Sequence, residues 1–539
     1  MQAVPTFFSN ILADTAMDES VASVDWAEYR TSDLNIASGN TQSSDYYQIV
    51  VKDTDQWLLM SQAYLQVRAK LVSSADAAIA DGQVVTLAAA GASLFQRMEL
   101  LANDSQIDIC ENPQFVQLVN ALLNYSKDKL TSVAESEWLM LDFAQGATGP
   151  QDGTGILLAG PVPQPLAIDG SEFTGLAADT WEHGDGAAII RQWVRSVANV
   201  ASNAGSNMPH YNSGFAARWN RSRNDRVFEV ILPLAAVFGF CRDIKSVHRG
   251  IKWELNLQKN IRYASIVHGT GALLGSGGAA SIPAATAGVK TLIQKVSLWV
   301  PQITPSLQTV EMLESALSQS VISKQYFENM TCRFSEEYPT ATQEIEWLLP
   351  LEGHSPTRIL FGFQRQAQYN TQDDIDLMAA PTADGVEYLQ LVDQTHSNPS
   401  AFSTMCTYNT ATKVMSGGIT EAELRVNTKS LPREKYRISF ADAQPEYERV
   451  YVDFLKSSGK FQDESGSAVS YRDYKNLYPL IAFDLRDYAD VFSGLKTNDI
   501  RFRARIPGGS ASAFRIVAVI YSERSLIVQP ISGRLSLKV

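Results

Sequence analysis

Residues 226–258 read RVFEVILPLAAVFGFCRDIKSVHRGIKWELNLQ, and a related pattern recurs at residues 477–507, LYPLIAFDLRDYADVFSGLKTNDIRFRARIP. Each stretch passes from a Pro-Leu pair through a Phe-containing segment to an aliphatic-Lys pair. Each then ends in a strand in which apolar and polar residues alternate. Alternation with a period of two places one set of side chains in a core and the other in water. Two similar halves of this kind predict a duplicated β-sandwich.

The alternation assigns a face to every residue of these two strands. Apolar side chains are expected to fill a core, and the polar side chains between them to face solvent. The expected core positions are Ile251, Trp253, Leu255, Leu257, Ile500, Phe502, Ala504 and Ile506. The expected solvent positions are Lys252, Glu254, Asn256, Gln258, Arg501, Arg503 and Arg505.

Size and composition describe a globular protein. A chain of 539 residues is too long for one core and predicts two large domains or three small ones. Its hydrophobic content of 45% and charged content of 19% supply enough apolar surface to fold. A net charge of −13 argues against bulk attraction to nucleic acid.

Charge is distributed unevenly between the two ends of the chain. Residues 1–50 contain seven acidic residues and one basic residue, Arg30. Residues 501–539 contain seven basic residues and one acidic residue, Glu523. Both ends can be solvated, or one of them meets an oppositely charged neighbour. The sequence leaves these two readings open.

The cysteines predict a reducing compartment. No two of the four are close enough for a Cys-x-x-Cys motif, so we expect buried thiols and no disulfides. No basic segment precedes the apolar patch at the N-terminus, so no secretory signal is expected, and no run is long enough for a membrane-spanning helix. We therefore expect a soluble protein. The four cysteines are Cys110, Cys241, Cys332 and Cys406.

Turn residues and periodicity indicate three parts of the chain. Residues 1–45 are expected to form an N-terminal arm, residues 46–304 a first domain and residues 305–539 a second. A connecting helix is expected at about residues 305–320, and Trp299 is expected to pack at the junction of the domains. Other helical periodicity falls at residues 113–130, whereas residues 447–455 fit a helix or a strand. Three long loops, at residues 142–186, 267–288 and 366–418, predict contact with partners.

No motif in the sequence indicates catalysis. The six histidines lack zinc-site spacing, and neither a GxSxG motif nor a phosphate-binding loop occurs. Two carboxylate clusters, Asp373-Asp374-Asp376 and Glu336-Glu337, fit solvated loops better than an adventitious calcium site. The basic stretch at residues 218–226 fits a loop or interface better than an anion contact. We therefore assign no catalytic, cofactor-binding or metal-binding residue and expect no enzyme activity.

Several stretches, in this order along the chain, resemble the double jelly-roll major capsid proteins of double-stranded DNA viruses. The likeness is greatest to the hexon-like types of virophages and of Polinton- or adintovirus-like elements, and it spans roughly residues 46–530. The stretches that carry it are ILPLAAVFGF (231–240), IKWELNLQKN (251–260), VSLWVPQITPS (296–306), PTRILFGFQ (356–364), ITEAELRVNTKSLPREKY (419–436) and YPLIAFDLR (478–486).

This resemblance implies an all-β fold of two eight-stranded jelly-roll β-sandwiches in tandem, with short helices in loops. It implies a structural major capsid protein that forms homotrimeric, pseudo-hexagonal capsomers in an icosahedral virion shell. Its implied partners are copies of itself, neighbouring capsomers, a penton or vertex protein and minor capsid proteins, with no specific nucleic acid. Assembly would take place inside the host cell, and the sequence does not indicate an internal membrane.

An alternative function stays open at this point. A receptor- or glycan-binding β-sandwich, such as a fibre or lectin-like module, would also need long loops and no catalytic site. A β-sandwich hydrolase would need carboxylates gathered in one cleft, for which Glu337 and Asp374 are the candidates.

Overall fold

A computed structural model of the chain describes most of the two expected domains. The described residues are 21–31, 45–52, 55–73, 77–79, 84–130, 132–141, 144–146, 210–212, 218, 221–222, 225–260, 266–269, 271–272, 281–282, 289–318, 323–351, 356–369, 400–409, 414–427, 429–441, 443–462, 466–488, 499–510, 512–529 and 534–538. The predicted loops at 142–186 and 366–418 lie mostly outside these ranges, as does the cluster Asp373-Asp374-Asp376.

The first half of the chain forms two antiparallel sheets. One has the order β1 (Val21–Arg30), β15 (Val289–Pro305), β4 (Tyr64–Ser73), β10 (Val227–Pro233), with the short β3 (Trp57–Leu58) also paired to β15. The other has the order β2 (Tyr46–Val51), β11 (Trp253–Lys259), β6 (Phe95–Ala102), β7 (Ser105–Glu111).

The second half repeats this arrangement. Its larger sheet has the order β16 (Ser323–Phe334), β25 (Phe514–Gln529), β18 (Pro356–Arg365), β23 (Ile481–Asp484), with β26 (Arg534–Lys538) paired to β25. Its other sheet has the order β17 (Glu344–Leu348), β24 (Ile500–Arg505), β21 (Glu421–Val426), β22 (Lys429–Arg437).

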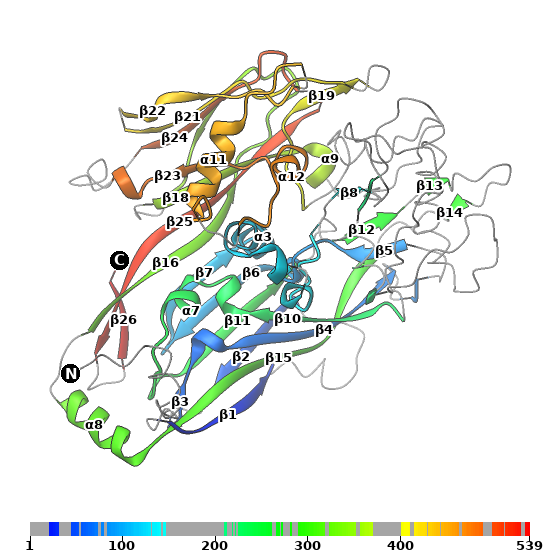
Figure 1. Cartoon of the computed structure of the whole chain (residues 1–539). Coiled ribbons are helices and arrows are strands. Elements are labelled where there is room, and N and C mark those ends of the chain that lie inside the picture. Colours follow the sequence, from blue (N-terminus) through cyan, green and yellow to red (C-terminus); the bar gives the residue numbers. More distant parts are fainter. Residues whose placement is uncertain are drawn as a thin grey trace, which may run out of the picture.

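The two halves have the same topology. When the eight main strands of each half are counted in chain order, the sheets read 1-8-3-6 and 2-7-4-5 in both cases. Two four-stranded antiparallel sheets connected in this way form a jelly roll. The chain is therefore all-β, with two eight-stranded jelly rolls in tandem, as the sequence predicted (Figure 1).

The sequence repeat falls on equivalent strands. The first stretch supplies the sixth and seventh strands of the first roll, β10 and β11, and the second stretch supplies β23 and β24 of the second roll. Every expected core residue of the two alternating strands is buried. One expected solvent residue, Glu254, is also buried, because Gln48 and Lys252 contact its carboxylate.

Helices and short hairpins connect the strands. The helices are α3 (Pro113–Asn124), α4 (Lys127–Leu130), α7 (Gly239–Asp243), α8 (Leu307–Ser318), α9 (Gln366–Tyr369), α11 (Glu448–Ser457) and α12 (Tyr471–Asn476), with single 3-10 turns at Met60–Gln62, Gly91–Leu94, Val133–Glu135, Leu234–Ala236 and Arg486–Tyr488. The short strands are β5 (Val84–Leu87), β8 (Ala144–Gly146), β9 (His210–Asn212), β12 (Ile266–Gly269), β13 (Gly271–Ala272), β14 (Ser281–Ile282), β19 (Cys406–Asn409) and β20 (Val414–Gly417).

Two helical predictions are refined by the structure. The helical periodicity at residues 113–130 forms two helices, because Tyr125 is extended, with ψ of 143°, and ends α3. Residues 447–455, which fit a helix or a strand, lie mainly in the helix α11. Among the helices of the described residues, none is both long and apolar enough to cross a membrane.

The N-terminal part of the chain differs from the expected arm. Residues 21–30 form β1, which pairs with β15 at the edge of the larger sheet of the first roll. We therefore propose that the first roll begins at β1. We also propose a division near residue 304, where β15 ends and α8 leads to β16.

Candidate functional site

The two rolls lie side by side, with α3 and α7 between them (Figure 1). Rings of the first roll meet rings of the second edge-on: Phe240 and Phe327 at 5.8 Å, and Phe115 and Phe334 at 5.5 Å between ring centres. At Gly239 the backbones approach closely, because an added Cβ would lie 1.8 Å from the carbonyl oxygen of Glu328. This junction fixes the position of one roll relative to the other.

Polar groups in the same junction are paired, and two of them, Asp108 and Asn329, are buried. The carboxylate of Asp108, on β7, accepts a 3.0 Å hydrogen bond from the backbone N–H of Phe240 and another from the side chain of Asn329, on β16. Burial raises the pKa of Asp108 to about 6, although both hydrogen bonds oppose the shift. Nearby, the guanidinium of Arg242 donates 3.2 Å hydrogen bonds to the backbone carbonyl and the side chain of Glu328. The junction is thus structural.

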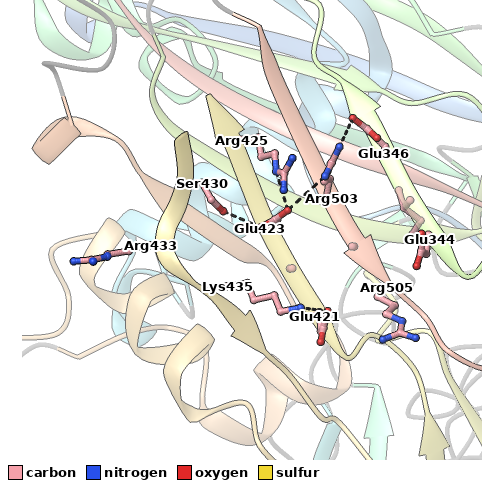
Figure 2. Close-up of a pocket in the computed structure, with 13 residues that line it drawn as sticks. Glu344, Glu346, Glu421, Glu423, Arg425, Ser430, Arg433, Lys435, Arg503 and Arg505 are labelled. Atoms are coloured by element: carbon pink, nitrogen blue, oxygen red, sulfur yellow. Dashed lines mark hydrogen bonds and ion pairs between the residues drawn. The ribbon is translucent and has the colours of Figure 1, made fainter. Parts of the chain in front are cut away.

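An open, charged hollow of about 790 Å³ lies on the second roll, on the solvent side of the sheet β17-β24-β21-β22. We call this surface the charged face. The alternating strands place Ile345, Phe502 and Leu424 in the core, and their neighbours point outward. The charged side chains that line the hollow are Glu344, Glu346, Glu421, Glu423, Arg425, Arg433, Lys435, Arg503 and Arg505 (Figure 2).

Ion pairs connect the middle of the charged face. Glu346 accepts a 2.9 Å hydrogen bond from Arg503 and a 3.0 Å hydrogen bond from Arg501, and these two bonds lower the pKa of its carboxyl group. Glu423 accepts hydrogen bonds from Arg425 at 3.1 Å and from Ser430 at 2.8 Å. Figure 2 shows Arg425 and Ser430 turned toward Glu423, and Arg503 turned toward Glu346.

Fewer ion pairs connect the charged side chains around Glu421, Arg433 and Arg505. Lys435 lies 2.6 Å from Glu421. Arg433 projects from β22 away from the ion pairs in Figure 2, and no described residue pairs with it or with Arg505. Acidic and basic groups are nearly balanced in the hollow, so its surface does not carry charge of a single sign.

A second exposed surface consists of aromatic rings on the larger sheet of the first roll. Trp26, which is 47% exposed, lies on the edge strand β1 with its ring centre 5.4 Å from that of Tyr64. Tyr64 stacks on Trp299 at 6.3 Å, and the Trp299 indole N–H donates a 2.8 Å hydrogen bond to Gln66. Trp299 was expected at the junction of the domains. That expectation is wrong, because Trp299 lies midway along β15 and faces outward beside Tyr64.

The described ionisable residues that the sequence singled out do not meet in one cleft, and Asp373, Asp374 and Asp376 lie outside the described residues. His248 is buried beside Trp253 and Phe240, and burial lowers its pKa to about 4. Glu337 accepts a 2.7 Å hydrogen bond from the hydroxyl of Tyr369. The described residues include no group of three or more metal-ligating side chains that could hold an ion.

The cysteines are internal, as is part of the basic stretch. All four cysteines are buried free thiols, and burial raises the pKa of Cys110, Cys241 and Cys332. Within the basic stretch at residues 218–226, Arg218 is fully buried and donates to the backbone carbonyl of Met140. Arg226 is also buried, whereas Arg221 is exposed and donates to the backbone carbonyl of Glu135. Of the arginines described in this stretch, two are therefore internal and one is at the surface.

Comparison with solved structures bears on the fold. A chain of the Sputnik virophage, determined by electron cryomicroscopy, superposes with a TM-score of 0.53 at 10% identity, covering 98% of this chain and 90% of that chain. This protein has the double jelly-roll fold found in virus capsids. The likeness extends over both rolls, because it covers nearly the whole of this chain.

Two further solved structures are similar at lower scores. They are the Faustovirus major capsid protein, with a TM-score of 0.48, 9% identity and coverage of 97% of this chain and 94% of that chain, and the mavirus major capsid protein, with 0.44, 11%, 100% and 95%. No known family model matches the double jelly-roll sequence, and no curated protein matches it.

The charged face was not predicted from the sequence. Its residues come from β17, from the consecutive strands β21 and β22, and from β24, and only strand register brings these three segments together. One signal was present, because Arg501, Arg503 and Arg505 were assigned to the solvent side of one strand.

Proposed function

We propose that this chain is a major capsid protein and acts by binding copies of itself, without catalysis. The observation that carries the proposal is the double jelly-roll topology, which superposes on a chain of a virophage over 98% of this chain. Two rolls locked by a buried junction form a rigid building block, which a shell requires. The proposed location of the protein is the virion capsid, which would be assembled inside the host cell.

The finer assembly is a homotrimer with six rolls, which forms a pseudo-hexagonal capsomer and tiles an icosahedral shell. Support comes from two exposed surfaces that suit protein contacts, the charged face and the aromatic rings around Trp26. Further partners of the proposed shell are a penton or vertex protein and minor capsid proteins. The long loops at 142–186, 267–288 and 366–418 are proposed as contact regions for such partners.

Mass and images of the purified protein test this proposal. A homotrimer of 59.2 kDa chains has a mass of about 178 kDa, and negative-stain electron microscopy should show hexagonal particles. A monomer near 59.2 kDa without such particles, at concentrations of tens of micromolar, would contradict the proposal.

The exposed ring of Trp26 favours a second candidate, a receptor- or glycan-binding β-sandwich. Sugars stack on exposed aromatic faces, and Trp26 with Tyr64 offers one. A stable monomer that binds members of a glycan array, and loses that binding when Trp26 is replaced by Ala, would favour this candidate over the capsid protein.

A further inference from the structure

Charges of alternating sign cross the charged face from one strand to the next. The register of the four strands places Glu344, Arg505, Glu421 and Arg437 opposite one another in a single row. Residues directly opposite in antiparallel strands point to the same side of the sheet. This outer row therefore reads acidic, basic, acidic, basic from β17 to β22.

The side chains of the outer row form fewer hydrogen bonds and ion pairs within the chain than those of the row beside it. The next row begins with Glu346 and Arg503, which are hydrogen bonded to each other within the chain. In contrast, the described part of the chain supplies no hydrogen bond or ion pair to the side chains of Glu344, Arg505 and Arg437, all of which are exposed. Within the described part of the chain, three charges of the outer row thus have no partner.

A sign pattern of this kind is complementary to itself under one symmetry operation. If a second copy is turned by a two-fold axis that runs parallel to the strands, the order of its strands is reversed. Glu344 then faces Arg437 of the second copy, and Arg505 faces its Glu421. A two-fold axis perpendicular to the strands would instead place each charge against its own like charge. Isologous contacts require such self-complementary surfaces.

We propose that a second copy of this chain docks on the charged face, sheet to sheet, about a two-fold axis parallel to the strands. The inference rests on the proposed function, because a self-assembling shell supplies the second copy. In that setting the contact joins two neighbouring capsomers.

The charge balance favours a second copy over a small or polymeric ion. The hollow is lined by four acidic and five basic side chains, so neither a polyanion nor a cation finds a surface of one sign. The edge strand β22 also argues against a contact through backbone hydrogen bonds on its side of the sheet. Strand β22 contains Pro432, which has no N–H, at the point where its register with β21 shifts.

Charge reversal tests the proposal without disturbing internal pairs. Because the contact is symmetric, Glu344→Lys creates two repulsive contacts with Arg437, and Arg437→Glu creates two with Glu344. Each single variant should weaken association of the assembled protein about tenfold at low salt. The double variant E344K/R437E restores both contacts and should regain wild-type association.

The controls carry the same changes of net charge at other exposed positions. Glu311→Lys on α8 matches Glu344→Lys, and Lys52→Glu beside β2 matches Arg437→Glu. Association is measured by sedimentation over a range of salt concentrations, and unchanged thermal unfolding shows that each variant is folded. Controls that weaken association as strongly as the reversals would overturn the proposal, as would a double variant that stays weak.

Cross-linking separates the two-fold arrangement from an edge-to-edge chain. Facing sheets lie about 10 Å apart, so E344C/R437C is treated with a short bis-maleimide, to which the four buried native cysteines are inaccessible. A two-fold contact gives one covalent dimer of about 118 kDa, twice 59.2 kDa. Glu344→Cys alone should cross-link little, because two copies of residue 344 would be about 17 Å apart, offset by three strand spacings and by the gap between the sheets.

The outcomes distinguish this inference from the proposed function. A discrete covalent dimer supports the two-fold contact. A ladder of covalent oligomers shows edge-to-edge joining and overturns it, and so does the absence of cross-linking in preparations that form hexagonal particles. In the last case the proposed capsid function stands and the inference fails. A monomeric wild-type protein that shows neither particles nor cross-links contradicts both.

Discussion

At the scale of single residues, Asp108 is a buried carboxyl group whose pKa depends on its surroundings. Its carboxylate lies in the junction between the rolls, with hydrogen bonds from α7 and β16. Burial raises its pKa from an ordinary 3.8 to about 6. Because the pKa is raised in the folded state, folding favours the neutral carboxyl group. Above about pH 6 the group is charged in the folded state as well, and its burial then lowers the free energy of unfolding.

The pH dependence of stability follows from this shift. Burial of Asp108 should have no cost well below pH 3.8, where its carboxyl group is neutral in both the folded and the unfolded states. Stability should then fall by about 3 kcal/mol as pH rises through 6. The free energy of unfolding, measured by denaturant titration between about pH 3.5 and 6.5, should show this fall in the wild type relative to Asp108→Asn. Parallel curves for the two proteins would contradict the assignment.

At the scale of elements, α3 is a short helix that is almost entirely buried in the core. Eleven of its twelve residues are buried, and it packs against the second roll as well as the first. Phe115 meets Phe334 edge-on at 5.5 Å and Phe402 at 6.2 Å. The helix therefore belongs to the junction between the rolls.

Truncation of Phe115 tests this role. Phe115→Ala should lower the free energy of unfolding by about 3–5 kcal/mol, because it leaves a cavity between the two rolls. Phe461→Ala is the matched control: Phe461 is 49% exposed, and its loss should cost less than about 1 kcal/mol. Equal losses in the two variants, measured by denaturant unfolding, would show that α3 does not join the rolls.

The elements also show what sequence could and could not predict. The alternation in β11 and β24 is local, so the duplicated sandwich and the core positions of these strands were predictable. Strand β1 was not, because its exposed, acidic residues lack a clear apolar period and only pairing with β15 orders them. The charged face escaped prediction for a related reason: cross-strand register depends on the whole sheet.

At the scale of the whole molecule, the junction makes two similar rolls into one unit. Glu328 shows how tight the contact is, since its carbonyl oxygen occupies the space that a side chain at Gly239 would need. Charged groups and aromatic rings surround this point, and Arg333 of β16 forms an ion pair with Glu111 of β7. We expect the two rolls to unfold together.

A single methyl group at the junction tests that expectation. Gly239→Ala must displace β16 and should destabilise the protein by about 3 kcal/mol. It should also split the single unfolding transition, followed by intrinsic fluorescence and circular dichroism, into two. Gly508→Ala, where nothing lies within 4 Å of the added Cβ, should leave the transition unchanged. A variant of Gly239 with wild-type unfolding would show that the rolls are not locked there.

Pro432 has a consequence for behaviour in concentrated solution. Proteins produced in large amounts risk polymerising into fibrils when exposed strand edges find one another. At Pro432 strand β22 has no donor to offer an incoming strand, and charged residues follow directly. This edge is therefore protected against amyloid-like growth. In concentrated solution we expect the protein to associate through its side chains and not through backbone pairing at this edge.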